Sequence, residues 1–308
     1  MSAWPRLDYT ADRPTLDSVH LLLQLLGKLP TRLHPWINHG WHVALRMTPR
    51  GPMTRDLPAG ERHFTAALDM LDGTIRVVCD TGAESVVPAA RRTLAQVHAD
   101  LSALLRSLGL PAPLHGKPNE LPDPVAFADD RRPRAWDPDA AQRLLGAFLC
   151  ADRQFNVFRS LYRGKSSPSH LFWGSLDLAV TRFSGRTAPE HPGGVPHLPD
   201  AVTREAYSHE VISAGFWPGN DAYPHAAFYA YAYPVPPGLA EASVLPAGAF
   251  WQADMGEFLL PYQAVRAAPD PGAALQAFLQ STYQAAAERL HWPRGLTLAA
   301  ASIGRPPA

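Results

Sequence analysis

The stretch SHLFWGSLDLAVTRFSGR, residues 169–186, mixes side chains that belong in a core with ionisable and aromatic ones. Successive side chains of a β-strand point to opposite faces of a sheet. If residues 169–183 form one strand, one face carries Leu176, Leu178 and Val180, and the other carries Trp173, Asp177 and Thr181. The stretch therefore predicts a sheet with one apolar face toward the core and one polar, aromatic face that is a candidate wall of a site.

The sequence around this stretch predicts further strands and several amphipathic helices. Strands are expected over 36–51, 61–70, 74–80, 206–217, 226–233 and 249–260. Helices are expected over 14–29 with Thr15 as the N-cap, over 88–108, from Asp137 and Pro138 onward, and from Asp270 and Pro271 onward. We therefore predict an α+β fold with largely antiparallel sheets and amphipathic helices packed over them.

The order of these elements is similar in the two halves of the chain. Each half runs helix, strands, helix, and the first strand of each contains His and Trp, in INHGWHVALRMTPRG at 37–51 and SHLFWGSLDLAVTRFSG at 169–185. The halves would span 14–118 and 137–290, with the proline-rich residues 119–136 connecting them over the surface. We treat residues 1–308 as one unit, and a diverged duplication of its halves is an interpretation that the sequence leaves open.

The composition argues against several classes of function. Lys and Arg together number 28, as do Asp and Glu, so the chain lacks the positive excess that binds nucleic acid or an anionic membrane surface. No segment has the roughly 20 apolar residues of a membrane span, and we find no signal peptide, so we expect a soluble, cytoplasmic protein. The sequence contains no G-x-S-x-G, Walker, G-x-G-x-x-G, H-E-x-x-H or C-x-x-C motif.

Aromatic and ionisable residues gather on the polar faces of the later predicted strands. In EAYSHEVISAGFWPG, residues 205–219, alternation places on one face Glu205, Tyr207, His209 and Trp217. In FYAYAYP, residues 228–234, it places on one face Tyr229, Tyr231 and Tyr233. If these faces align with that of Asp177, they form an aromatic pocket with a few convergent polar groups, which is typical of a small-molecule site. A polar core in which the carboxylates satisfy buried Tyr and Trp groups is the alternative.

We predict a role for each of these residues. The predicted catalytic residues are His209, Glu205, Asp177 and Arg182. Glu205 or Asp177 would act as the acid or base, His209 would shuttle a proton, and Arg182 would orient an anionic group. The predicted ligand-binding residues are Trp173, Trp217, Tyr207, Tyr229 and Tyr231.

The 13 histidines raise the question of a metal site. His39 and His42 in NHGWH point to opposite faces if they lie on a strand, so they do not make a convincing pair of ligands. His39, His170 and His209 on separate strands could together hold a divalent metal, with a carboxylate and an open position for water. The protein would then be a metal-assisted hydrolase. Histidines that are satisfied within the core or at helix caps are the alternative.

A family resemblance rests on long motifs, among them NHGWHVAL at 38–45, SHLFWGSLDLAVTRFSGR at 169–186, EAYSHEVISAGFWPG at 205–219 and GEFLLPY at 256–262. In these motifs the chain resembles, from about Trp4 to Trp292, a bacterial family of uncharacterised proteins, a domain of unknown function. The resemblance implies one family unit rather than a fusion, and it implies no activity, cofactor or catalytic residue. The family pattern has a second aromatic residue where Gly40 stands, so no stacking role is implied there.

These observations favour an enzyme that acts on a small polar molecule by acid/base chemistry, with or without a metal. Carbohydrate-like substrates suit aromatic rings combined with paired carboxylates. The first alternative is a non-catalytic protein that binds a planar or hydrophobic small ligand, and the second is a structural protein without a pocket. Carboxyl groups that converge with perturbed pKa values would favour the enzyme.

Overall fold

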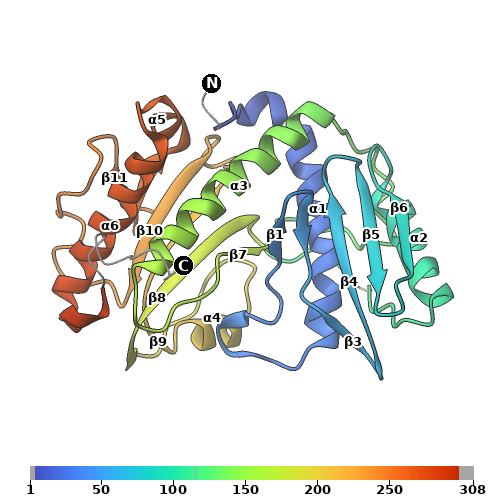
Figure 1. Cartoon of the computed structure of the whole chain (residues 1–308), viewed down its shortest axis with the longest axis horizontal. Helices are drawn as coiled ribbons and strands as arrows, with labels where there is room; N and C mark the ends of the chain where they lie inside the picture. Colours follow the sequence, from blue (N-terminus) through green and yellow to red (C-terminus); the bar gives the residue numbers. More distant parts are fainter. Residues whose placement is uncertain (1–3, 115, 298–308) are drawn as a thin grey trace, which may run out of the picture.

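Two antiparallel sheets, with helices on their faces, build the α+β fold that the sequence predicts (Figure 1). The computed structural model describes residues 4–114 and 116–297. The first sheet has the strand order β1-β2-β4-β5-β6, with β3 also paired to β4. The second has the order β11-β12-β10-β9-β8-β7. The predicted fold class is therefore confirmed.

The first half begins with helix α1 (Tyr9–Leu33) and ends with helix α2 (Leu94–Ser107). Between them lie the short 3-10 helix η1 (Asn38–Gly40) and the strands β1 (Arg46–Thr48), β2 (Gly51–Met53), β3 (Leu57–Ala59), β4 (Arg62–Asp69), β5 (Thr74–Cys79) and β6 (Glu84–Pro88). Two predicted helix starts are wrong. The side chain of Asp8, not Thr15, caps α1, and a capping box of Thr93 and Gln96 starts α2.

The second half begins with helix α3 (Pro138–Ser160) and ends with helix α6 (Pro271–Arg289) and the 3-10 helix η2 (Arg294–Leu296). Between them lie β7 (His170–Phe172), β8 (Asp177–Thr187), α4 (Asp200–Ala206), β9 (His209–Trp217), β10 (Ala227–Tyr233), β11 (Phe250–Gln252), β12 (Glu257–Pro261) and α5 (Tyr262–Ala267). Asp137 and Asp270 cap α3 and α6 and proline follows each of them, as predicted.

The stretch at 169–183 is a hairpin rather than one strand, so that prediction is wrong. Phe172 of β7 pairs with Asp177 of β8, and residues 173–176 form the turn between them. Leu176 closes the turn with φ of 58°, a left-handed conformation that a continuing strand does not allow. The predicted strand at 249–260 is likewise the hairpin of β11 and β12.

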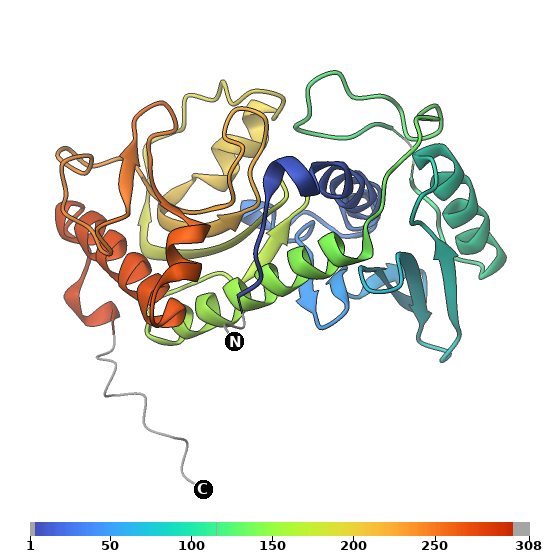
Figure 2. The same cartoon turned by 90° about the horizontal axis from the view of Figure 1, so that it is seen from above.

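The two sheets meet edge to edge between β1 and β7. The backbone N–H of Leu45 donates to Leu171 O at 2.9 Å, and the N–H of Leu171 donates to Leu45 O at 2.8 Å. Figure 2 shows that the halves are covered on opposite sides, with α3 on one side of the second sheet and α1 on the other side of the first. The second sheet therefore keeps one face free of α3 and α6. That the halves arose by duplication stays a prediction.

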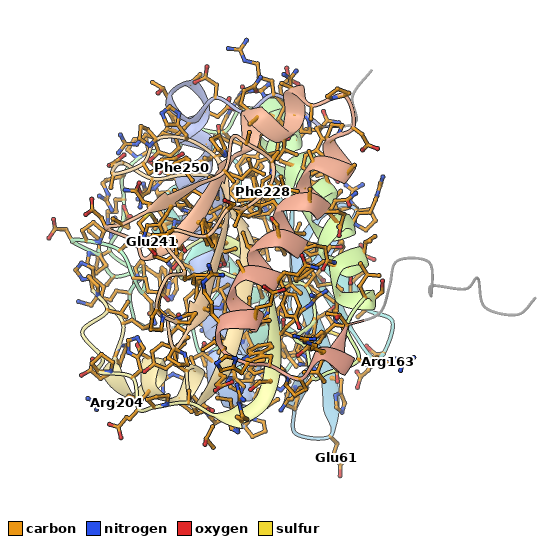
Figure 3. The ribbon with its side chains drawn as sticks, turned by 90° about the vertical axis from the view of Figure 1, so that its left-hand side faces the viewer. Glu61, Arg163, Arg204, Phe228, Glu241 and Phe250 are labelled. Carbon is orange, nitrogen blue, oxygen red and sulfur yellow. The ribbon has the colours of Figure 1, made fainter. Side chains whose placement is uncertain are left out.

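The core under the second sheet is aromatic. Phe148 and Phe155 of α3 pack edge-on against Phe216 of β9 and Phe228 of β10, with ring centroids 5.3 and 6.4 Å apart. Figure 3 shows Phe228 among closely packed side chains beside α6, whereas Arg204 lies at the rim of the molecule. Within the described ranges, no helix combines the length and the apolar character needed to cross a membrane.

Candidate functional site

Asp177 is the first residue of β8 and lies on the face of the second sheet that α3 and α6 leave free. Its neighbours Leu178 and Val180 point the other way and are fully buried in the core. The Tyr229 hydroxyl of β10 donates a hydrogen bond to Asp177 Oδ2 at 2.5 Å. Because β9 lies between β8 and β10, this hydrogen bond crosses an entire strand.

Gly215 of β9 makes that crossing possible. The strand register pairs Tyr229 with Gly215 and Gly215 with Ala179 of β8. A Cβ atom at Gly215 would overlap the ring of Tyr229. The missing side chain therefore lets the tyrosine ring lie over β9 and bring its hydroxyl to the carboxyl group of β8.

Three more residues extend this group. Tyr231 stacks with Tyr229 at a centroid distance of 6.1 Å and an interplanar angle of 17°, and its hydroxyl accepts a hydrogen bond from the Tyr207 hydroxyl at 3.1 Å. Tyr229 pairs with Leu259 of β12. Glu257 lies two positions before Leu259 in the same strand, so it shares the face of Tyr229. We call the set of Asp177, Glu257, Tyr207, Tyr229 and Tyr231 the acid–tyrosine face.

The two carboxyl groups of this face have strongly raised pKa values. Burial raises the pKa of Asp177 to about 7 against the opposing effect of the Tyr229 hydrogen bond, and the charge of Glu120 raises it further. Burial also raises the pKa of Glu257 to about 8, with a contribution from the charge of Asp177. Both residues nevertheless keep partial solvent exposure. Burial thus makes both carboxyl groups of this face hold their protons to a higher pH than ordinary carboxyl groups do.

Glu120 reaches this face from the proline-rich connection between the halves. The Ser175 hydroxyl in the β7–β8 turn donates to Glu120 Oε2 at 2.6 Å. A Cβ atom at Gly174 would overlap the Glu120 carboxyl group, so the glycine allows this approach. A segment far from the sheet in sequence thus adds a third acidic group beside Asp177.

Arg182 does not contact Asp177, although both lie on β8. Strand alternation places it on the α3 and α6 side, where it is fully buried. Its guanidinium lies 3.4 Å from the ring centroid of Phe158 and 4.4 Å from that of Tyr283, and Nη2 donates to Phe158 O. Burial lowers the pKa of Arg182 to about 9, so it stays cationic at neutral pH. It is a core residue held by aromatic rings.

The two predicted tryptophans lie in different places. Trp173 lies in the β7–β8 turn, where its indole N–H donates to Val43 O at 3.0 Å and its ring packs against Gly27 of α1. It is 5% exposed, so its ring is packed inside the fold rather than open to a ligand. Trp217 ends β9 on the same face as Gly215 and stacks with Tyr223 at 5.8 Å, so it borders the acid–tyrosine face.

Glu205, His209 and His39 form a separate cluster at the other end of β9. The backbone N–H of His39 donates to Glu205 Oε2 at 2.7 Å, and the rings of His39 and His209 lie 5.9 Å apart. His209 is the first residue of β9 and Trp217 the last, which at about 3.3 Å per residue separates them by about 26 Å. The structure therefore does not bring Glu205 and His209 to Asp177.

The three histidines predicted to bind a metal are not assembled into one site. The ring of His170 packs edge-on against the ring of Trp41, with a centroid distance of 6.1 Å. Burial lowers the pKa of His170 to about 3 and also lowers that of His39. Within residues 4–114 and 116–297, no group of three or more His, Cys, Asp or Glu side chains is positioned to hold a metal ion.

Sequence reasoning missed Glu257, Glu120 and Gly215. Glu257 had a signal, since it is a carboxylate at the start of the apolar run Phe258–Leu260 in a predicted strand. Glu120 had none, because its approach depends on the path of the long connection. The role of Gly215 depends on strand register, which alternation within a single strand does not define.

Comparisons with known proteins place the chain in a family without assigning it an activity. No curated protein and no solved structure matches it. The model of the family DUF5996 matches residues 4–298, which agrees with the predicted resemblance to a domain of unknown function. The match covers nearly the whole chain. The chain therefore belongs to DUF5996, a family of unknown function.

Proposed function

We propose that the protein is an enzyme that acts on a small polar molecule by acid/base chemistry at the acid–tyrosine face. One observation carries this proposal: Asp177, which accepts a hydrogen bond from the Tyr229 hydroxyl, and Glu257 lie on the same partly exposed face of the sheet, and burial raises their pKa values to about 7 and about 8. A general acid or base works best when its pKa lies near the working pH. Perturbed carboxyl groups of this kind are typical of functional sites.

The coupling divides the roles between the two groups. Between about pH 7 and pH 8 the pair holds mainly one proton, so one carboxyl group can accept a proton while the other donates one. Asp177, with the lower pKa, would be the base, and Glu257 would be the acid. Burial raises the pKa values of Tyr229 and Tyr231 well above their ordinary value, so both stay protonated and supply hydroxyl donors.

The aromatic rings would supply the binding surface. Tyr229 and Tyr231 are stacked, and Trp217 stacks with Tyr223 at the border of the face. Rings of this kind contact the apolar faces of a small molecule while nearby polar groups fix its orientation. The ring stacks also support a second candidate function, a non-catalytic binding protein for a planar ligand. In that case the carboxyl groups would only satisfy tyrosine hydroxyls.

A panel of 4-nitrophenyl glycosides, with neutral and amino sugars, tests the acid/base proposal. Wild-type protein should release nitrophenol with a bell-shaped pH dependence that peaks between about pH 7 and pH 8. Asp177→Asn and Glu257→Gln should each abolish turnover, and Glu241→Gln, on the β10–β11 loop, should not. Turnover that survives in both acid variants would contradict the proposal. Binding without turnover, retained in both variants, would favour the binding protein.

A further inference from the structure

An open hollow with a volume of about 510 Å³ lies where the two halves meet, and none of its lining residues belongs to the acid–tyrosine face. It is lined by Pro14 and Thr15 of α1, by Arg91 of the β6–α2 loop, and by residues 134–137, where the connection joins α3. Pockets that hold small molecules have volumes of about 300–1,000 Å³. The hollow is therefore large enough for a small organic ligand.

Arg91 brings a guanidinium to this hollow from a loop with an unusual backbone conformation. Its φ of 59° lies in the left-handed region, which residues other than glycine adopt rarely. The loop is held in place because the N–H groups of Ala89 and Ala90 both donate to Gly73 O, at 2.9 and 2.8 Å. Arg91 Nε donates to Trp136 O at 3.3 Å, and among the residues that the structure describes Arg91 has no ion-pair partner. The protein thus anchors one side of the guanidinium and leaves its positive charge unpaired.

Arg134 brings a second guanidinium, and part of it lacks a protein acceptor. Its Nη2 donates to Oδ2 of Asp130, which is 1% exposed and accepts a second hydrogen bond from Arg132 at 2.7 Å. The Nε atom of Arg134 is buried and has no hydrogen-bond partner. A buried donor without an acceptor is costly, so an acceptor supplied by a ligand would stabilise this group.

The positive charge of the lining exceeds its negative charge. Asp137 is the one acidic residue of the lining, and as the N-cap of α3 its carboxylate accepts the N–H of Asp139 at 3.0 Å. The partial positive charge of a helix N-terminus offsets a carboxylate at this position. Asp17 of α1 is paired with Arg13 at 3.7 Å. These carboxylates already have partners, so the charge of Arg91 is available to a ligand.

We propose that this hollow binds a small organic anion, with a carboxylate or phosphate group held by Arg91 and Arg134. The planar fork of N–H donors of a guanidinium matches the oxygens of both groups. Ala11, Pro14 and Ala135 in the lining offer apolar contacts to the rest of the ligand. The inference goes beyond the proposed function, because it assigns a second site that uses none of the residues of the acid–tyrosine face.

The test compares phenyl phosphate and benzoate with the neutral benzyl alcohol. Titration calorimetry on the full chain uses about 50 mM NaCl, where interactions between charges are only weakly screened. At least one of the two anions should bind about tenfold or more tightly than benzyl alcohol. That anion should also shift the nitrogen-15 NMR signal of Arg134 Nε, which is identified by its absence in Arg134→Lys.

Two matched substitutions locate the bound anion. Arg91→Gln should weaken its binding about tenfold, because the substitution removes a charge-assisted hydrogen bond. Arg106→Gln removes another exposed arginine, on α2 outside the hollow, and should change the affinity less than twofold. Circular dichroism confirms that both variants are folded.

Several results would overturn the inference. If benzyl alcohol binds as tightly as both anions, the charge of the arginines plays no part in binding. If Arg91→Gln leaves the affinity unchanged, or weakens it no more than Arg106→Gln does, the anion binds elsewhere or without specificity. If neither anion binds at about 50 mM, the hollow is not an anion site. The glycoside assay and its acid variants decide the proposed function separately.

Discussion

Replacing Asp177 with Asn should make the protein more stable than the wild type at alkaline pH while changing its stability little at acidic pH. The substitution keeps the size of the side chain and an oxygen that can accept the Tyr229 hydrogen bond. It removes only the ability to ionise. Any difference between variant and wild type that grows with pH therefore reports the cost of charging Asp177 in the folded protein.

The size of the effect follows from the raised pKa. The pKa of Asp177 is about 7 in the folded chain and has its ordinary value of 3.8 in the unfolded chain. The folded protein thus holds this proton more tightly, and the stability it contributes is complete below about pH 4 and lost as the pH rises through 7. Each pKa unit corresponds to about 1.4 kcal/mol, so the full cost is about 4 kcal/mol. Because Asp177 is partly exposed, we expect roughly half of this, about 2 kcal/mol, in the measured free energy of unfolding.

Urea unfolding, followed by circular dichroism at about pH 5 and about pH 8.5, measures this difference. Asp177→Asn should exceed the wild type by less than about 1 kcal/mol at the lower pH, where only part of the cost is present, and by about 2 kcal/mol at the higher. Asp254→Asn, in the exposed β11–β12 turn, is the matched control and should follow the wild type at both. A variant whose stability runs parallel to that of the wild type, or falls below it at pH 8.5, would show that charging Asp177 costs the folded protein nothing.

Three more substitutions test individual contacts of the site and of the core. Gly27→Ala should lower the free energy of unfolding, measured in urea, by about 1–3 kcal/mol, because the new Cβ would overlap the buried indole ring of Trp173. The control Gly295→Ala has open space around its Cβ and should change the free energy of unfolding by less than about 0.5 kcal/mol, so equal effects of the two substitutions would contradict the packing. Tyr229→Phe removes a hydrogen bond that favours the ionised form of Asp177, so the pKa of Asp177, followed by carbon-13 NMR, should rise by about 1. A fall in the pKa of Asp177 would contradict this hydrogen bond. Arg182→Met should change the free energy of unfolding by less than about 1 kcal/mol, because methionine fills a similar volume and removes a buried guanidinium whose Nε and Nη1 atoms have no hydrogen-bond partner. A loss of about 3 kcal/mol would mean that the contacts of the guanidinium with the aromatic rings stabilise the fold.

The Asp-Pro starts of two helices could be predicted from the sequence, whereas the starts of α1 and α2 were assigned wrongly although Asp8 and Thr93 cap them locally. Asp-Pro pairs at 137–138 and 270–271 start helices as local chemistry dictates. Helix α1 begins six residues before Thr15, despite Pro14 within it. Its first turns are held by contacts across the fold, with the Tyr9 hydroxyl donating to Asp221 and Arg143 paired with Asp12. No local pattern reports such partners.

The candidate site was predictable to the level of faces but not of contacts. Alternation along FYAYAYP correctly placed Tyr229 and Tyr231 on one face, since each side chain follows from its position in the strand. The bond from Tyr229 to Asp177 depends on which strands are neighbours and on a glycine lying between them. His209 illustrates the converse, because a residue on the right strand can still lie at its far end. Strand order and register are properties of the whole sheet.

A carbon-13 NMR titration of the side-chain carboxyl groups shows whether Asp177 and Glu257 form a coupled acid/base pair. In the wild type the two signals should titrate together between about pH 6 and pH 9. In Asp177→Asn the remaining Glu257 signal should titrate at a lower pH than in the wild type, because the neighbouring charge is gone. Two signals that each titrate below pH 5, with Glu257 unaffected by Asp177→Asn, would contradict the existence of a coupled acid/base pair.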